Sequence, residues 1–272
     1  MIDKVYKFYK KYMCSVAALC GFLFAIIPEE LFAMEICFYF SEKINIFLAR
    51  FGLFAILLFL YYCYKNNRNS ALIEGYDYKI TVEYGNLFKV ENCKKVIPFD
   101  ECFTTTVGDR PFDINKTSIC GQYLLKNSIS QRDMYELIKE SGLKPLRSRS
   151  SCQNKIRYES GSLVPRDNDL LLAFSKLDSK GLGVLSKHEY IDSLFRLWSE
   201  IDTYYKGIDI CVPVLGSGVT RIGDKKLTQQ ELLDIMIATY KLSTYKIKKP
   251  QKLRIICRKK DNFSIGNIGE TV

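Results

Sequence analysis

Histidine is almost absent from this chain, and its cysteines lack any metal-binding pattern. The single histidine, His188, cannot complete a Cys/His metal set, and none of the ten cysteines belongs to a CxxC pair. Structural zinc sites need such ligands at regular spacing. We therefore expect no metal ion and no resident cofactor, and we interpret the cysteines as reduced, mostly packed thiols of a cytosolic domain.

The positive charge also lacks the features of a nucleic-acid reader. The net charge is +10, but no aromatic stacking pattern or reader motif accompanies the basic group near the carboxyl terminus. We expect no nucleic-acid partner, and we interpret this group as the solvated flank of a strand or as a surface facing anionic lipid. It consists of Lys246, Lys248, Lys249, Lys252, Arg254, Arg258, Lys259 and Lys260.

The first 64 residues are crowded with apolar side chains and lack a signal-peptide cleavage site. Residues 12–27 carry no charge, and residues 44–64 carry one, Arg50. About 20 residues cross the ~30 Å hydrocarbon core, so the second run fits, and the first fits if flanking lysines reach the interface. We predict a transmembrane hairpin over residues 1–68, with helices at about 5–27 and 44–64.

Charges beside the two runs predict an orientation. Lysines precede the first run, Lys65 and Arg68 follow the second, and the loop between them is acidic. The positive-inside rule then places both termini in the cytoplasm. Arg50 is costly at the bilayer centre, so we expect it to reach one interface or to face a partner helix. A pair of buried helices in a soluble domain is the alternative.

The rest of the chain alternates between strand and helix patterns, which predicts a three-layer α/β domain. Residues 144–157 are basic and Ser-rich and are expected to form a mobile loop, and no periodicity follows Asp261. Capping boxes open helices at Ser186 and Thr228. We expect strands at 78–84, 95–99, 169–175, 208–215 and 252–257, and helices at 130–140, 186–205 and 228–242.

The segment Ile208–Thr220 carries the clearest functional signal. An apolar strand runs into Gly216-Ser217-Gly218, and a helix begins soon afterwards. Glycines permit positive φ and close approach to a ligand, and consecutive N–H groups in such a turn form a nest for phosphate. Because α/β sheets bind ligands beyond the carboxyl ends of their strands, this loop predicts a nucleotide-diphosphate ligand.

Several segments together resemble a known family. Residues 82–88 resemble the opening strand and turn of macro domains, and residues 213–220 resemble their second phosphate loop. Residues 96–105, 118–122 and 169–178 resemble the divergent macro domain of Thoeris anti-phage effectors. In the membrane type of that family a transmembrane hairpin precedes the macro domain, and the resemblance extends over residues 1–260.

The resemblance implies an architecture and a function. It implies a macro-domain-like α/β fold with three layers and a mixed sheet over residues 76–260, after the hairpin and before a tail at 261–272. It also implies a partner TIR-domain enzyme that consumes NAD and makes an ADP-ribose derivative, histidine-ADP-ribose in the membrane type. This second messenger would drive homo-oligomers to disrupt the bacterial inner membrane, ending in growth arrest or death of the infected cell.

The candidate ligand-binding residues follow from these segments. Asn86 stands where many macro domains carry an aspartate that accepts a hydrogen bond from adenine; an amide oxygen can still accept, and a plain turn residue is the alternative. We expect the Phe103 ring to pack on a ribose or a base of the ligand; the alternative is that it fills the core beside the loop. We expect the Arg221 side chain to contact a pyrophosphate; the alternative is that it is a solvated surface residue. The full set is Asn86, Leu87, Phe99, Asp100, Phe103, Thr104, Thr105, Cys120, Gly121, Leu215, Gly216, Ser217, Gly218, Val219, Thr220 and Arg221.

Catalysis is not expected. The glycine run and asparagine-rich loop of macro hydrolases do not occur here, and a hydrolase needs a base within hydrogen-bond reach of its water. Asp100 is the best candidate for that base, and His188 is expected at the surface. We predict binding without turnover, with a membrane-tethered ADP-ribose hydrolase and an adaptor without a nucleotide role as the alternatives.

Overall fold

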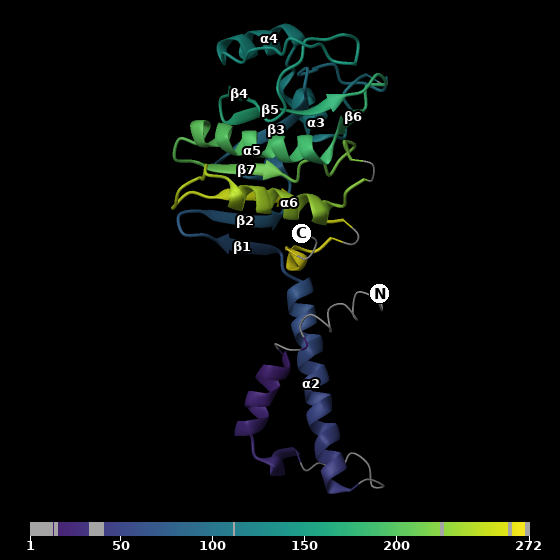
Figure 1. Cartoon of the computed structure of the whole chain (residues 1–272), viewed down its shortest axis with the longest axis vertical. Helices are drawn as coiled ribbons and strands as arrows, with labels where there is room; N and C mark the ends of the chain where they lie inside the picture. Colours follow the sequence, from purple (N-terminus) through teal and green to yellow (C-terminus); the bar gives the residue numbers. More distant parts are fainter. Residues whose placement is uncertain are drawn as a thin grey trace. The chain divides into compact units, whose positions relative to one another are not determined.

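The computed structural model describes residues 13, 16–32, 41–110, 112–223, 226–260 and 263–269 (Figure 1). The chain divides into two compact units, Met1–Arg68 and Asn69–Val272. Each unit has its own core, and each is described separately below.

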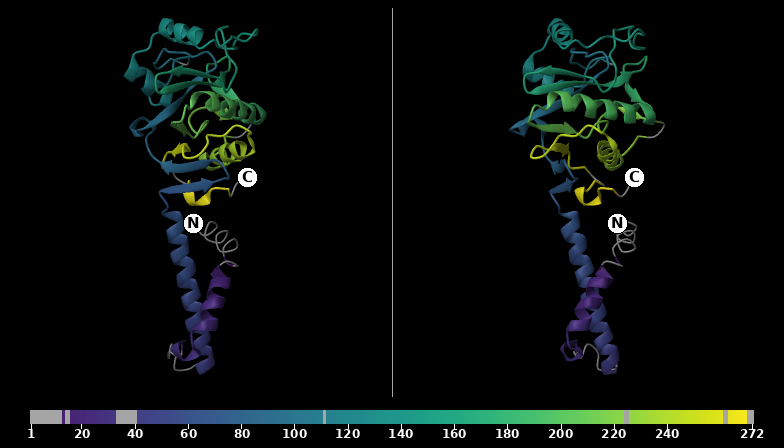
Figure 2. Two further views of the ribbon diagram at one scale, coloured as in Figure 1. Left: turned by 90° about the vertical axis from the view of Figure 1, so that its left-hand side faces the viewer. Right: turned by 60° about the vertical axis from the view of Figure 1, so that its left-hand side comes forward.

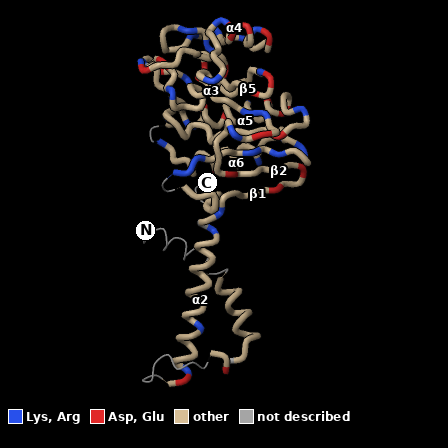
Figure 3. The backbone as a smooth tube through the Cα atoms, turned by 180° about the vertical axis from the view of Figure 1, so that it is seen from behind, with Lys and Arg blue, Asp and Glu red and all other residues tan. Residues whose placement is uncertain are grey.

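The amino-terminal unit contains a long apolar helix, α2 (Glu42–Asn66). An 18-residue stretch within Glu42–Lys65 has a mean hydropathy of 2.1, and only 6% of it is buried. Figure 3 accordingly shows α2 free of charge along most of its length. Within the described residues this one helix is long and apolar enough to cross a membrane. The first expected helix is described only in part, as Val16–Ile26, and this part is shorter than a membrane span. Residues 1–12 lie outside the described part of the chain.

Arg50 of α2 lies beside two aromatic rings. Its guanidinium carbon is 5.6 Å from the ring centre of Phe24 and 5.2 Å from that of Phe32, which belongs to the short helix η1 (Glu29–Phe32). Such cation–π contacts partly offset the cost of removing a guanidinium from water. Elsewhere the unit exposes large apolar side chains, among them Phe22, Phe47 and Phe59, as a lipid-facing surface does.

The carboxy-terminal unit is built on a mixed sheet whose described strands follow the order β1-β2-β9-β7-β3-β5-β6-β8, with β4 beside β5. Neighbours from β2 to β5 along this order are parallel, whereas β1, β4 and β6 run antiparallel to their partners β2, β5 and β5. The strands are β1 (Ser70–Glu74), β2 (Lys79–Tyr84), β3 (Cys93–Asp100), β4 (Leu163–Arg166), β5 (Asp169–Leu177), β6 (Gly183–Leu185), β7 (Asp209–Pro213), β8 (Arg221–Ile222) and β9 (Leu253–Cys257).

Helices cover both faces of the sheet (Figure 2). On β5, Leu170 and Leu172 face the core under α5 (Lys187–Tyr204) and α6 (Gln229–Leu242). Leu171 and Ala173 face the core under α3 (Ile119–Asn127) and α4 (Gln131–Glu140). This alternation follows from the two-residue period of a strand. The predicted α/β class with three layers and a mixed sheet is confirmed.

The chain enters this unit beside a loop that begins at Gly85. The backbone N–H of Tyr84, the last residue of β2, donates to the carbonyl of Asn69, 3.3 Å away. The next residue, Gly85, donates to the carbonyl of Cys257 at the end of β9, 3.1 Å away. The start of β1 and the carboxyl ends of β2 and β9 therefore lie at one edge of the sheet.

Two segments differ from the expectations. Residues 144–157 contain no helix or strand, but they are tied down, because the Glu101 carboxylate accepts hydrogen bonds from Ser150 Oγ at 2.8 Å and from Arg157 Nη1 at 3.2 Å. Beyond residue 261, Ile265 of η3 (Ile265–Asn267) is buried, and Phe263 packs edge-on against Tyr84. Residues 263–269 thus belong to the core of this unit instead of forming a separate tail.

Candidate ligand-binding cleft

The carboxyl ends of the parallel strands carry the loops of a cleft. Residues 85–87 follow β2, residues 214–220 follow β7 and residues 258–260 follow β9. Two adjoining pockets open there, of about 290 Å³ and 450 Å³, called the first and the second pocket below. They share Ile119, Pro213, Val214, Ser217 and Arg258. A ligand with two connected parts can therefore occupy both.

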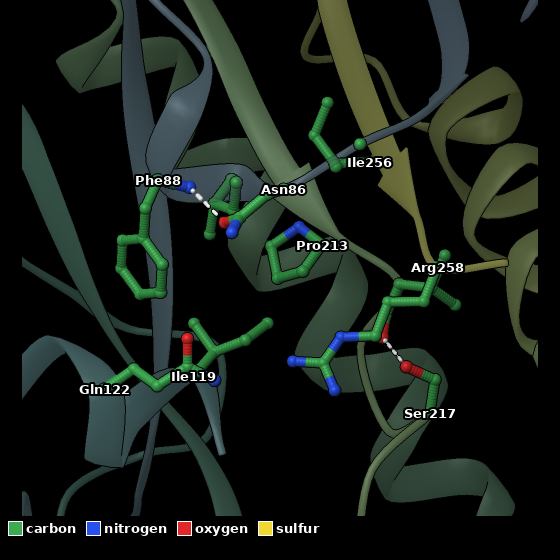
Figure 4. A pocket seen from close by; sticks show the side chains of 11 residues that line it. Asn86, Phe88, Ile119, Gln122, Pro213, Ser217, Ile256 and Arg258 are labelled. Carbon is green, nitrogen blue, oxygen red and sulfur yellow. Dashed lines mark hydrogen bonds between the residues drawn. The ribbon is translucent and has the colours of Figure 1, made fainter. Parts of the chain in front are cut away.

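The first pocket has apolar walls and a few polar groups (Figure 4). Its Asn86 side chain caps η2 (Leu87–Lys89), since Oδ1 accepts from the Phe88 N–H at 3.0 Å. Gln122 is held by its Nε2, which donates to the Thr117 carbonyl at 2.8 Å. Both amides are thus fixed by backbone bonds. The apolar walls come from Phe88, Ile119, Pro213 and Ile256.

The second pocket is built around the glycine loop after β7. Gly216 has φ +77°, a backbone conformation that favours glycine, and a Cβ there would lie 2.4 Å from Ile222 Cδ1 and force that side chain to shift. Ser217 Oγ donates to the Val214 carbonyl at 2.7 Å, which uses the hydroxyl inside the loop. A Cβ on Gly218 would meet no atom within 4 Å, so this residue opens onto free space.

Positive side chains gather around the same loop. Lys260 Nζ donates to the Ser217 carbonyl at 2.6 Å. Burial lowers the pKa of Lys260, and the neighbouring charges of Arg258 and Lys226 lower it further. Among the described residues, no carboxylate lies within ion-pair distance of any of these three cations. Like charges held together around a glycine loop favour an anion there.

Asp100 lies at the wall of the second pocket, but its carboxylate is engaged by its own loop. Oδ1 accepts from the Cys102 N–H at 2.7 Å, and the Thr104 N–H and hydroxyl donate to the same carboxylate at 3.3 to 3.4 Å. Burial raises the pKa of Asp100, and these hydrogen bonds oppose that rise. The hydrolase alternative would need Asp100 as a free catalytic base, whereas in this geometry the carboxylate holds its own loop.

The structure brings most of the predicted ligand-binding residues to the two pockets. The ones that line them are Asn86, Leu87, Phe99, Asp100, Cys120, Leu215, Gly216, Ser217, Gly218, Val219 and Thr220.

Five predicted residues line neither pocket, each for a local reason. Phe103 is fully buried between Phe99 and Tyr158, which makes it a core residue. Thr104 is bound to Asp100, and the N–H and hydroxyl of Thr105 both bond to Gln131 Oε1. A side chain at Gly121 would meet the Asn115 carbonyl at 2.1 Å, so this glycine serves helix packing. The exposed Arg221 belongs to β8.

Other pocket residues had not been predicted. Arg258 lines both pockets, and Figure 4 shows its guanidinium pointing into the space between Pro213, Ile119 and Ser217. Its position directly after the last expected strand was a usable signal, because ligands bind beyond strand carboxyl ends. Phe88, Ile119 and Gln122 lie within the segments 82–88 and 118–122 that carry the family resemblance, but they were not among the expected ligand-binding residues. Leu182, which is 40% exposed, lies on the rim of the second pocket with Val219, which is 71% exposed.

The fold and the cleft define an α/β domain with a diphosphate-type glycine loop, and comparison with known proteins identifies its family. Residues 80–258 match the family described as "Thoeris protein ThsA, Macro domain". The chain therefore belongs to the Thoeris ThsA macro-domain family, as its sequence motifs predicted, and is an anti-phage defence protein.

One relative is Thoeris protein ThsA of Bacillus amyloliquefaciens (strain Y2), which is 29% identical over 236 residues, or 82% of this chain and 77% of that protein. Among solved structures, an Oceanobacillus iheyensis macrodomain with ADP has 11% identity and a TM-score of 0.45, with 74% of this chain and 94% of the other covered. The same macrodomain with MES bound gives 11% identity and a TM-score of 0.44, with 73% and 93% covered.

Proposed function

We propose that the cleft binds an ADP-ribose derivative as a signal of phage infection. The observation that carries this proposal is the junction of the two pockets. An apolar slot suited to a planar base adjoins a glycine loop surrounded by cations that form no ion pair with a described carboxylate, and Ser217 and Arg258 lie where the two meet. A nucleotide with a base, a diphosphate and a second sugar has this order of parts.

The remainder of the ligand would occupy the second pocket. The diphosphate would lie on the N–H groups of the loop at Gly216–Gly218, with Arg258 and Lys260 beside it. The distal ribose and its substituent would extend towards Leu182 and Val219. Membership of the Thoeris family supports a ligand made from NAD by a partner TIR-domain enzyme, and we propose histidine-ADP-ribose as that ligand.

We propose binding without turnover. A hydrolase requires a group free to activate water, and the Asp100 carboxylate accepts hydrogen bonds from the backbone of its own loop instead. Incubation of the protein with ADP-ribose conjugates and chromatography of the products tests this point. Release of free ADP-ribose that disappears in Asp100→Ala would favour the hydrolase alternative.

We also propose that the amino-terminal unit anchors the protein in the bacterial inner membrane as a multi-pass hairpin, with both termini and the macro domain in the cytoplasm. The low burial and high hydropathy of α2 support this. A ligand acts by favouring one state over another, and the favoured state here would be a homo-oligomer that disrupts the bilayer and stops growth of the infected cell. Release of the chain from membranes by alkaline carbonate would contradict the anchor.

A charge placed at Gly218 tests ligand binding. In Gly218→Glu the side chain enters open space without backbone strain and puts a carboxylate beside the proposed diphosphate. We expect titration calorimetry of the full-length chain in nanodiscs to show at least a ~10-fold weaker Kd for ADP-ribose and for histidine-ADP-ribose, or about 1.4 kcal/mol. The control is Leu242→Glu, which adds the same charge at a residue that is 75% exposed and lines neither pocket. Equal affinities of the two variants would overturn the proposal.

A further inference from the structure

The first pocket contains a hydrogen-bond donor at the position where a purine base would be recognised. We infer that Asn86 reads an acceptor atom of the base, so that the cleft accepts purine nucleotides with a 6-oxo group, such as hypoxanthine, as well as those with adenine. This inference rests on the proposed function, because it concerns the same ligand.

The orientation of the Asn86 amide follows from its neighbour. Oδ1 caps η2 by accepting from the Phe88 N–H at 3.0 Å. The other end of the amide could not face that N–H, because Nδ2 carries only donors. Nδ2 therefore lies on the far side from the Phe88 N–H (Figure 4), and among the described residues no acceptor bonds to it. The amide thus offers a free donor, Nδ2, in addition to the second lone pair of Oδ1 with which it was expected to accept from adenine.

The rest of the first pocket contributes further polar groups. Arg258 points into it, and a guanidinium has only donors. The side-chain acceptors on the lining are Gln122 Oε1, whose amide is oriented by the bond from Nε2 to the Thr117 carbonyl, Ser217 Oγ and the second lone pair of Asn86 Oδ1. Phe88, Ile119, Pro213 and Ile256 supply apolar contact with a ring but no further side-chain polarity. The pocket thus offers a free amide donor at Asn86 together with acceptors, and so can meet either kind of group on a base.

The free Nδ2 donor of Asn86 has a consequence for base selectivity. Adenine presents an amino group at position 6, whereas hypoxanthine presents a carbonyl there. A carboxylate at residue 86 would accept from the amino group and repel the carbonyl, whereas an amide nitrogen can donate to the carbonyl or to a ring nitrogen. Residue 86 thereby sets which purines the cleft tolerates.

The variant Asn86→Asp isolates this effect, because Asp and Asn are equally good helix caps and nearly equal in shape. We propose to titrate the full-length chain in nanodiscs with ADP-ribose and with inosine diphosphate ribose, its hypoxanthine counterpart. For the natural chain we expect the two Kd values to lie within ~10-fold of each other. In Asn86→Asp the ratio of the hypoxanthine Kd to the adenine Kd should rise by ~10-fold or more, in line with the discrimination that one base contact provides.

Each outcome decides the matter. An Asn86→Asp ratio within about twofold of the natural one overturns the inference, as does rejection of the hypoxanthine ligand by the natural chain by more than ~10-fold. Binding of neither purine ligand to the natural chain overturns the proposed function, and the inference falls with it. If Asn86→Asp does not fold, Asn86→Ser retains a capping oxygen without the amide nitrogen and should shift the same ratio towards adenine.

Discussion

Arg258 gives the sharpest test of how the cleft holds its ligand. Its guanidinium lies where the two pockets meet, and no described carboxylate neutralises it. A hydrogen bond to a charged group contributes about 1.5–3 kcal/mol, and the exposed position of Arg258 argues for the lower end. Replacing Arg258 by Gln should therefore weaken the Kd for ADP-ribose by ~10-fold.

The assay is titration calorimetry at several KCl concentrations. Loss of one ligand-facing charge should make the Kd less dependent on salt. Arg258→Lys should be intermediate, since an ammonium keeps the charge but not the planar fork of a guanidinium. The control is Lys259→Gln, which removes one charge at the next residue, outside both pockets. A change of less than about twofold in Arg258→Gln, or an equal change in Lys259→Gln, would refute a direct contact between Arg258 and the ligand.

Two further predictions concern the loops around the cleft. Burial raises the pKa of Asp100, so its folded form binds a proton more tightly than the unfolded chain, and the stability it provides is present at acid pH and lost as pH rises through that raised pKa. In thermal melts the melting temperature of the natural chain minus that of Asp100→Asn should fall as the pH rises from 3 to 7, because other carboxyls such as Glu189, whose pKa is lowered, affect both proteins alike; a difference that does not change with pH would contradict it. Arg157→Ala leaves the buried Glu101 carboxylate without its cation and should cost about 3 kcal/mol of unfolding free energy. Trypsin should then cut residues 144–157 faster than in the natural chain. Equal cleavage rates would contradict the idea that the Arg157–Glu101 ion pair holds this segment in place.

The elements with strong local signals were predictable. Capping boxes at Ser186 and Thr228 mark the starts of α5 and α6, and both boxes form. β6 and β8 have only three and two residues, too few to show a period. Helix α3 was not among the expected helices, since a glycine at position 121 disfavours a helix; in the structure Ser118 caps the helix by accepting from the Gly121 N–H.

The cleft was predictable where backbone conformation alone sets it, as at Gly216–Gly218. It was not predictable after β3, because the pairing of β3 with β5 shifts its register between Phe99 and Asp100. Such an irregularity changes which side chains face the core and which face the cleft. Phe103 enters the core with φ +50°, a conformation that a phenylalanine seldom adopts. No periodicity in the sequence encodes either event.

The bond between Tyr84 and Asn69 has a structural consequence. Tyr84 ends the strand from which the Gly85 loop of the cleft departs, and Asn69 is where the chain enters the domain. Only residues 67–69 lie between α2 and β1 in the sequence. The cleft loop and the residue at which the chain enters the domain are thus joined to the same rung of the sheet, beside the β1–β2 ladder and the bond from Gly85 to Cys257.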